Sequence, residues 1–492
     1  MKKLISAIML GFLIILAFPQ NYTSPYTVIR VTDNEYADKE PQINDSNDVV
    51  WQGDDGNDFE IYMYEWLIDW VWQFTDNSSH DKHPKINNNG DIAWQQDDGT
   101  DMTILFYEKA EDTIWEIVTS DRDNSWNTLV PFMNNNGDIV WHENTGASYN
   151  IFFYDNSTGN ILQLTSDVAV NNYNPKINDN REIVWFRYFS DAETGRDRYS
   201  IVYYDTTLGY AQYIWTLETI IGAFAMNVER KEPQICNNGS VIWNFYDLGL
   251  SDTEIYYFDR QAGRVLQLTD NSDFDVGPDI NSNGDAVWRI QAEYNDIILY
   301  THSTGETLNI SDAENHAYWG PTMCRISDSG HVTFQAVEAR IVNWNNEVYV
   351  WDGSEVTNIS QSDNNEYYPM INGLGNVVWA VDTDAEDDEI YLAYLPEEEG
   401  NGDGDENGNG EGGFPDCFIA TACYGTPMAE EVKILRNFRD QQLMTNPVGK
   451  AFVRVYNKYG PKAAVFIRDK EPLKKIIRLC LKPLIWLIEV SS

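Results

Sequence analysis

The sequence predicts an all-β fold, an eight-bladed β-propeller closed by its amino-terminal strand, followed by a small α-helical carboxyl-terminal domain. Three observations lead to this prediction. The segment PFMNNNGDIVW at residues 131–141 recurs eight times with variations. Most recurrences begin 43 to 48 residues apart, which is a typical period for propeller blades. The chain between them is rich in β-branched and aromatic residues and contains no amphipathic helix of useful length.

Each repeat divides into four short strands joined by turns. The first strand begins at a proline, and the second carries a tryptophan or phenylalanine. Asparagine and glycine between them tolerate positive φ and allow a tight hairpin. A third strand such as NIFFYD (150–155) and a fourth such as NILQLTS (160–166) complete the repeat. The prolines are Pro41, Pro84, Pro131, Pro175, Pro233, Pro278, Pro321 and Pro369, and the matching aromatic residues are Trp51, Trp94, Trp141, Trp185, Trp243, Trp288, Phe334 and Trp379.

The two ends of the repeat region complement each other. The eighth repeat supplies three strands and then ends, whereas the chain opens with an unmatched fourth strand, YTVIRVT (26–32). Pairing these segments would close a ring and remove the open sheet edges of a linear array. An incomplete solenoid is the alternative, and it does not explain the matching ends. We therefore expect a propeller domain over residues 23–395.

The repeats resemble those of TolB-type propellers. The resemblance is carried by LTSDVAVNNYNPKINDNREIVW (164–185) and WQGDDGNDFEIYMYE (51–65), and it extends over nearly all of residues 26–395. It implies a fold and no particular activity. The chain differs from TolB itself, because it has eight repeats instead of six and no preceding α/β domain.

The amino terminus has the pattern of a secretory signal peptide. Lys2 and Lys3 precede an apolar run over residues 4–18, and residues 1–22 as a whole are predicted to be the signal. An uncleaved amino-terminal anchor is the alternative, although the run is short for a membrane span. The sequence thus predicts an exported protein that is periplasmic, on the cell surface or secreted.

The formal net charge of −45 limits the partners. A strongly acidic surface repels the nucleic-acid backbone, so nucleic acid is not an expected partner. Acidity of this size is compatible with binding of cations or cationic partners.

The carboxyl-terminal part begins after an acidic, glycine-rich linker over residues 396–415. Residues 416–492 carry 13 Lys and Arg against 7 Asp and Glu, the reverse of the balance before them. The segment CFIATACYGTPMAEEVKILRNFRD resembles the start of the CFI-box carboxyl-terminal domain. The resemblance implies sorting, anchoring or attachment, with no known activity.

This tail carries two further features. The basic, apolar segment 472–490 is suited either to an anionic membrane surface or to packing as a terminal helix. Cys417 and Cys423 form a disulfide, serve as a modification site, or are free thiols. Earlier in the chain, Cys236 and Cys324 are expected to be isolated thiols at positions where most repeats have asparagine.

One face of the predicted propeller, which we call the loop edge, carries the candidate ligand-binding residues. The loops from each fourth strand to the next first strand share this edge with the loops from second to third strands. Aromatic side chains beside carboxylates stack on sugars or hold a peptide, or else simply pack the loops together. The candidates are Tyr36, His80, Trp126, Tyr173, Phe274, Tyr318, Trp319, Tyr367 and Tyr368.

Metal and cofactor signals are weak. The sequence HDKH (80–83) has no third ligand nearby and is interpreted as two solvated histidines. No cofactor is predicted except calcium, which the aspartate-rich blade loops could hold, although sequences such as DDGND also suit a turn. The candidate calcium ligands are Asp54, Asp55, Asp58, Asp382 and Asp384.

No catalytic motif is present. The chain lacks GxSxG, a phosphate-binding glycine loop, HExxH and CxxC, which predicts that it is not an enzyme. The predicted function is an exported binding or scaffold protein that recognises a protein, peptide or glycan through one loop edge, with a carboxyl-terminal domain for sorting or anchoring. Two alternatives remain: a carbohydrate-active propeller enzyme, either a lyase or a glycosidase, and a structural envelope component without a specific ligand.

Overall fold

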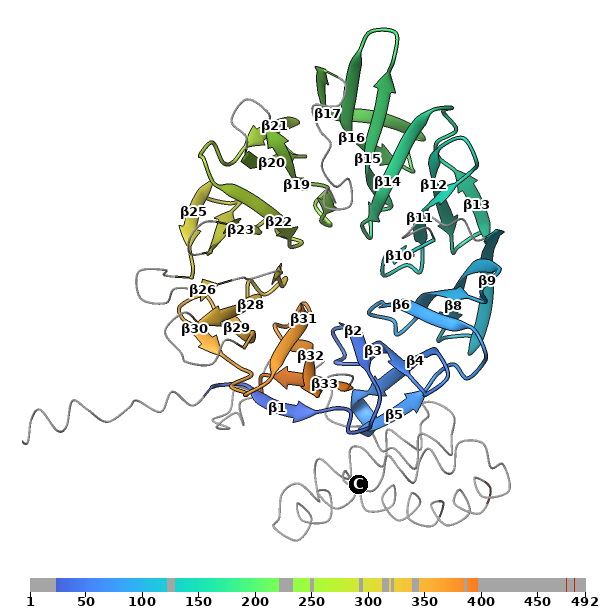
Figure 1. Ribbon diagram of the computed structural model, residues 1–492, viewed down its shortest axis with the longest axis vertical. Helices are drawn as coiled ribbons and strands as arrows, with labels where there is room; N and C mark the ends of the chain where they lie inside the picture. The colour runs from blue at the N-terminus through green and yellow to red at the C-terminus, as the bar shows by residue number, and fades with distance from the viewer. Residues whose placement is uncertain are drawn as a thin grey trace, which may run out of the picture. The chain divides into compact units, whose positions relative to one another are not determined.

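The computed structural model describes most of the repeat region (Figure 1). The described residues are 24–121, 129–220, 233–247, 252–291, 295–311, 318–319, 323–338, 345–384 and 387–396, with the single positions 475 and 482. The chain divides into two compact units, one of residues 1–41 with 123–397 and the other of residues 42–122 with 398–492.

The described strands form antiparallel sheets in chain order, each of four strands except the seventh, which has five. A short 3₁₀ helix, Trp66–Ile68, lies between the last two strands of the first sheet. The first four sheets are β2 (Asp38–Ile43), β3 (Val49–Asp54), β4 (Phe59–Glu65) and β5 (Trp70–Gln73); β6 (His80–Ile86), β7 (Ile92–Asp97), β8 (Asp101–Glu108) and β9 (Thr113–Asp121); β10 (Phe132–Met133), β11 (Ile139–Asn144), β12 (Tyr149–Asp155) and β13 (Asn160–Gln163); and β14 (Val170–Ile177), β15 (Glu182–Asp191), β16 (Arg196–Asp205) and β17 (Tyr210–Ile220).

Four further sheets follow the same plan. One parallel bridge, between Thr253 and Phe274, joins the fifth and sixth sheets. These sheets are β18 (Gln234–Ile235), β19 (Val241–Asp247), β20 (Asp252–Asp259) and β21 (Arg264–Gln267); β22 (Phe274–Ile280), β23 (Ala286–Gln291), β24 (Asp296–Thr301) and β25 (Glu306–Asn309); β26 (Tyr318–Trp319), β27 (Cys324–Ile326), β28 (Val332–Glu338), β29 (Glu347–Trp351) and β30 (Val356–Asn358); and β31 (Asn365–Ile371), β32 (Val377–Asp384) and β33 (Asp387–Tyr394) with β1 (Thr27–Arg30).

The eighth sheet is built from both ends of the repeat region. Strand β1 pairs antiparallel with β33, from Thr27 opposite Tyr394 to Arg30 opposite Tyr391. The guanidinium of Arg30 also lies 2.7 Å from the buried carboxylate of Glu389 in β33. The predicted pairing of the two unmatched ends is therefore confirmed.

The aromatic residue of the second strand packs against the preceding sheet in several repeats, as the repeat predicted. Trp94 in β7 lies in one cluster with Val50 and Ile61 of the preceding sheet. Removal of such a buried aromatic side chain costs about 3–5 kcal/mol. The equivalent residues, all 1% exposed or less, are Trp51, Trp94, Trp141, Trp185, Trp243, Trp288, Phe334 and Trp379.

Most of the first strands begin before the proline and not at it, whereas β10 and β18 begin directly after Pro131 and Pro233, close to the prediction. Strand β6 starts at His80, and its register with β7 shifts between Lys82 and Lys85 on either side of Pro84. His83, which precedes the proline, has a φ of 55°. A proline has no amide to give to the ladder, and a β-bulge accommodates it within a strand. The same shift occurs before Pro175, Pro278 and Pro369.

The asparagine turns both close hairpins and join neighbouring sheets. The side-chain oxygen of Asn134 accepts bonds from the amides of Asn136 and Asp138, and its Nδ2 donates to the carbonyl of Asn178 at 3.0 Å. Equivalent links run from Asn44 to the carbonyl of Asn87 and from Asn281 to that of Ser327. The recurring NNNG sequence is thus structural, as expected.

The seventh repeat corrects one alignment made from sequence. Ser327 takes the turn position of the asparagines, because its carbonyl accepts the bond from Asn281. Cys324 lies three residues earlier and so occupies the proline position, not the asparagine position. Cys236 does replace the turn asparagine, since the amide of Asn178 donates to its carbonyl at 2.9 Å. Both thiols are free and buried, which confirms that they are isolated.

Several predictions fall outside the described residues. These concern the signal peptide, the linker from residue 397 onward, Cys417, Cys423, the helical domain and, except for two isolated positions, segment 472–490. Within the part of the chain that the structure describes, no helix has the length and apolar character needed to cross a membrane.

Candidate functional site

The β3–β4 loop of the 42–122 unit folds into a tight turn through its own aspartates. Oδ1 of Asp54 accepts a bond from the amide of Gly56 at 2.7 Å, and Oδ1 of Asp55 accepts bonds from the amides of Asn57 and Asp58 at 2.8 and 3.2 Å. Gly56 has a φ of 94°, which glycine adopts readily. Asp54 is thus occupied in shaping the turn.

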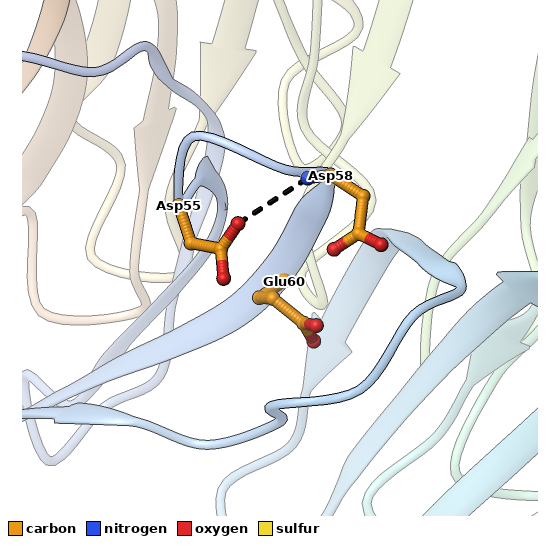
Figure 2. Close-up of side chains that lie close together, drawn as sticks. All are labelled: Asp55, Asp58 and Glu60. Atoms are coloured by element: carbon orange, nitrogen blue, oxygen red, sulfur yellow. Dashed lines mark hydrogen bonds between the residues drawn. The ribbon is translucent and has the colours of Figure 1, made fainter.

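This turn brings three carboxylates together at the start of β4. Asp58 and Glu60 are two residues apart and therefore lie on the same face of the extended chain. Asp55 approaches them from the turn, and one carboxylate oxygen from each residue lies within 4.8 Å of the others (Figure 2). We call Asp55, Asp58 and Glu60 the acidic triad.

Two of the three carboxylates are removed from solvent, and Asp55 is half-buried. Asp58 is 8% exposed and Glu60 is fully buried. Oε1 of Glu60 accepts a bond from the amide of Asn77 at 2.7 Å, but Oε2 of Glu60 and Oδ1 of Asp58 are buried without a hydrogen-bond partner. Burial raises the pKa of both carboxyls, and the charge of Glu60 adds to the rise in the pKa of Asp58.

His80 from β6 lies against the same loop. Its Nδ1 accepts a bond from the amide of Phe59 at 3.2 Å, and the two rings are 6.1 Å apart. The ammonium of Lys82 lies 5.0 Å from the Phe59 ring. The structure thus brings a predicted ligand-binding residue, His80, next to the predicted calcium ligands Asp55 and Asp58.

The β7–β8 loop shows which part of the triad is specific. Its sequence, DDGTD, forms the same turn, with Oδ1 of Asp98 accepting bonds from the amides of Thr100 and Asp101, both at 2.7 Å. The position of Glu60 is taken by Thr103, whose hydroxyl bonds to Thr119 at 2.9 Å. The hydrogen bonds of the turn therefore explain the aspartates in both loops. Glu60 distinguishes the first loop from the second, and the sequence analysis did not identify it.

The other predicted calcium ligands belong to the eighth sheet and have different surroundings. Asp382 is opposite Asp388 in the β32–β33 ladder, and Asp388 lies 3.3 Å from the ammonium of Lys39. Asp384 lies at the end of β32, opposite Asp387. No group of three possible ligands includes Asp382 among the residues whose side chains are described.

Two of the predicted aromatic residues pack against aromatic residues at the ends of second or third strands. The ring of Tyr173 is 4.9 Å from that of Tyr149 at the start of β12, and the ring of Phe274 is 6.4 Å from that of Tyr246 near the end of β19. The start of a first strand thus lies beside the end of a second strand or the start of a third. Burial raises the pKa of Tyr173 to about 12, whereas Phe274 remains 41% exposed.

The remaining predicted residues are placed as follows. Tyr367 and Tyr368 are neighbours with ring centroids 6.3 Å apart, and Tyr368 is 45% exposed. Tyr36 is also exposed. Tyr318 and Trp319 form the strand β26, which pairs with β28, and only their backbone is described. Trp126 lies outside the described residues.

Buried carboxylates lie beneath these loops and hold them in place. Asp275 accepts bonds from the indole of Trp288 at 2.8 Å and from the side chain of Asn271 at 2.7 Å. The amide of Asn271 donates to Glu254 at 3.1 Å. Burial raises the pKa of Asp275 to about 6. These bonds hold the loop before β22 in place. Glu60 and Asp81 accept the equivalent bonds from Asn77, but Oε2 of Glu254 also accepts a bond from Thr269, whereas Oε2 of Glu60 has no partner.

Comparison with known proteins supports the fold. No protein-family model and no curated relative matches the chain. Porphyromonas gingivalis dipeptidyl peptidase 4 is similar in structure, with a TM-score of 0.51 and 10% identity over 72% of this chain and 56% of that one. An oligogalacturonate lyase in complex with manganese has a TM-score of 0.47 and 11% identity, covering 77% of this chain and 96% of the lyase. The β-propeller domain of the trilobed protease from Pyrococcus furiosus has a TM-score of 0.42 and 15% identity, covering 64% of this chain and 95% of that domain.

These comparisons confirm a propeller-type fold and correct one prediction. The chain spans about half the length of the P. gingivalis peptidase. The expectation that the chain is not an enzyme is contradicted, because a solved structure with a similar fold, that of the P. gingivalis dipeptidyl peptidase 4, belongs to a peptidase. The absence of catalytic motifs was therefore a poor guide to whether the chain is an enzyme. Identities of 10–15% show the fold alone and assign no reaction. The resemblances to TolB-type repeats and to the CFI-box domain stay predictions.

Proposed function

We propose that this protein is an exported β-propeller that recognises a protein, peptide or glycan through the loop edge that carries the aromatic clusters. The observation that carries the proposal is the pairing of aromatic residues on this edge, as in Tyr246 with Phe274 and Tyr149 with Tyr173. Partly exposed rings such as Phe274 and Tyr368 offer flat apolar faces that remain accessible to a ligand.

The chemistry of this edge suits sugars and basic peptides. Aromatic rings stack on the apolar faces of sugars and attract cations through their π faces. Carboxylates next to the rings, such as Asp382 beside Tyr367, add hydrogen-bond acceptors and negative charge. A chain with a net charge of −45 attracts a cationic partner over a longer range.

The proposal includes a closed, eight-bladed ring as the scaffold. The recurrence of four-stranded sheets and the pairing of β1 with β33 support it. A ring closed by pairing of the two chain ends would hold the loops of successive blades in fixed positions relative to one another. This pre-organises a binding surface made of several loops.

The proposal also includes export and retention. The signal-like sequence at residues 1–22 supports export, to the periplasm, the cell surface or the medium. The basic tail supports sorting or anchoring, with segment 472–490 in contact with an anionic membrane surface.

A pull-down from native envelope and extracellular-matrix fractions tests recognition. The bait is the full-length protein, and the test bait carries Tyr246→Ala with Phe274→Ala. The control bait carries Ile161→Ala with Leu162→Ala, two exposed apolar side chains on the fourth strand β13. Circular dichroism first verifies that all three baits fold.

We expect the wild-type and control baits to capture the same protein or glycan and the test bait to lose most of it. Equal capture by all baits would place binding elsewhere on the chain. Capture by none would favour a structural envelope component without a specific ligand.

A further inference from the structure

We propose that the acidic triad of Asp55, Asp58 and Glu60 is a calcium-binding site. The site lies within the 42–122 unit and is independent of the recognition proposed above. Figure 2 shows the three carboxylates close together, with Asp55 in the turn, Asp58 directly before β4 and Glu60 in β4.

The spacing of the oxygens fits calcium. Calcium binds oxygen ligands at about 2.3–2.6 Å, so two oxygens on one ion are at most about 5 Å apart. The triad supplies one oxygen from each residue within 4.8 Å of the others. Magnesium binds at about 2.0–2.1 Å and limits this separation to about 4 Å, so its geometric requirement is stricter than that of calcium.

The buried oxygens provide the second argument. Oε2 of Glu60 and Oδ1 of Asp58 are buried and without a hydrogen-bond partner. An unsatisfied buried charge is costly, and it is usually paired or bound to a metal. Among the residues that the structure describes, no lysine or arginine forms an ion pair with the triad; the ammonium of Lys82 lies over the Phe59 ring instead. A divalent cation would satisfy both oxygens and offset the like charges.

The second blade supplies an internal comparison. Asp98 and Asp101 form the same turn as Asp55 and Asp58, but Thr103 stands in place of Glu60 and bonds to Thr119. The second loop therefore has the turn aspartates but no buried carboxylate. If Glu60 completes the site, the first loop binds calcium and the second does not.

Isothermal titration calorimetry with CaCl₂ on the full-length, EDTA-treated protein tests the site. The test variants are Glu60→Gln and Asp58→Asn, and the matched control is Asp101→Asn, which removes the same charge from the equivalent turn position. Asp55 is only half-buried, so Asp55→Asn provides a further test variant if the buried substitutions prevent folding. A parallel titration with MgCl₂ measures selectivity.

We expect one saturable calcium site in the wild-type protein, with at least tenfold weaker affinity in each test variant. The control should stay within twofold of wild type, and magnesium should bind more weakly than calcium. Equal affinities for Asp58→Asn and Asp101→Asn would show diffuse counter-ion binding to an acidic surface and overturn the proposal. The absence of saturable binding would overturn it as well, since the buried pair would then be held neutral by protonation.

Discussion

Replacement of Glu366 by glutamine should change how the stability of the protein depends on pH. Glu366 lies in β31 with its side chain fully buried, and its Oε1 accepts a bond from the Ser362 hydroxyl at 2.5 Å. Burial, reinforced by the charge of Glu347, raises the pKa of Glu366 from 4.5 to about 8. The folded protein therefore holds this proton more tightly than the unfolded chain does.

The sign and size of the effect follow from this pKa. The stabilisation from protonated Glu366 is fully present below pH 4.5 and is lost as the pH rises to about 8. A rise of the pKa from 4.5 to about 8 corresponds to at most about 5 kcal/mol. Glutamine keeps the shape of the protonated acid and does not ionise. Glu366→Gln should thus match wild type near pH 5 and exceed its free energy of unfolding by about 2–5 kcal/mol at pH 9.

Urea denaturation at a series of pH values between 5 and 9 measures this difference. The control variant is Glu306→Gln in β25, which removes the same charge from an exposed position. The reasoning is refuted if the two variants show the same pH dependence, because burial of Glu366 would then contribute nothing.

Three further substitutions test the fold. Asn134→Ala removes the bond to the carbonyl of Asn178 and the two bonds that Oδ1 accepts within the turn. Urea denaturation should show a free energy of unfolding that is lower by about 1–3 kcal/mol. An unchanged urea midpoint would contradict the role of the asparagine turns in joining sheets. Gly284→Ala places a Cβ 2.7 Å from Nδ2 of Asn238 at a φ of 88°, whereas the Cβ of Gly305→Ala, also at positive φ, meets open space. The first should therefore lower the melting temperature more than the second, and equal losses would show that only backbone strain matters. Arg30→Met leaves the buried carboxylate of Glu389 without its 2.7 Å partner. Amide hydrogen exchange in β1 should therefore accelerate several-fold relative to exchange in β25. Unchanged exchange in β1 would show that the backbone hydrogen bonds to β33 alone hold this strand.

The repeat pattern was sufficient to predict the sheets, because hydrophobic alternation and buried tryptophans recur at a fixed period. Trp94 and Trp243 lie between sheets for the reason the sequence suggested, and β1 completes the last sheet as expected. The bulge at Pro84 was missed, because nothing in the sequence marks the positive φ of His83. The seventh repeat was aligned on Pro321, whereas hydrogen bonding aligns it through Ser327.

The candidate site was only partly predictable. Asp55 and Asp58 stood out as neighbours in an aspartate-rich loop, but the same pattern at Asp98 and Asp101 is turn chemistry alone. Glu60 escaped notice because its importance depends on burial, which a single sequence does not reveal. The sequence indicated that aromatic residues gather here but not which ones pair, since Tyr246 in β19 and Phe274 in β22 come from different sheets.

Hydrogen–deuterium exchange of the complex captured from the envelope fraction tests the central claim, that ligand recognition occurs on the aromatic loop edge. Exchange is compared between the free protein and the captured complex. We predict slower exchange at residues 269–275, which lead into β22 beside Phe274, and unchanged exchange at the asparagine turn 281–285 on the opposite edge. Protection confined to the asparagine turns, with residues 269–275 unchanged, would contradict the account.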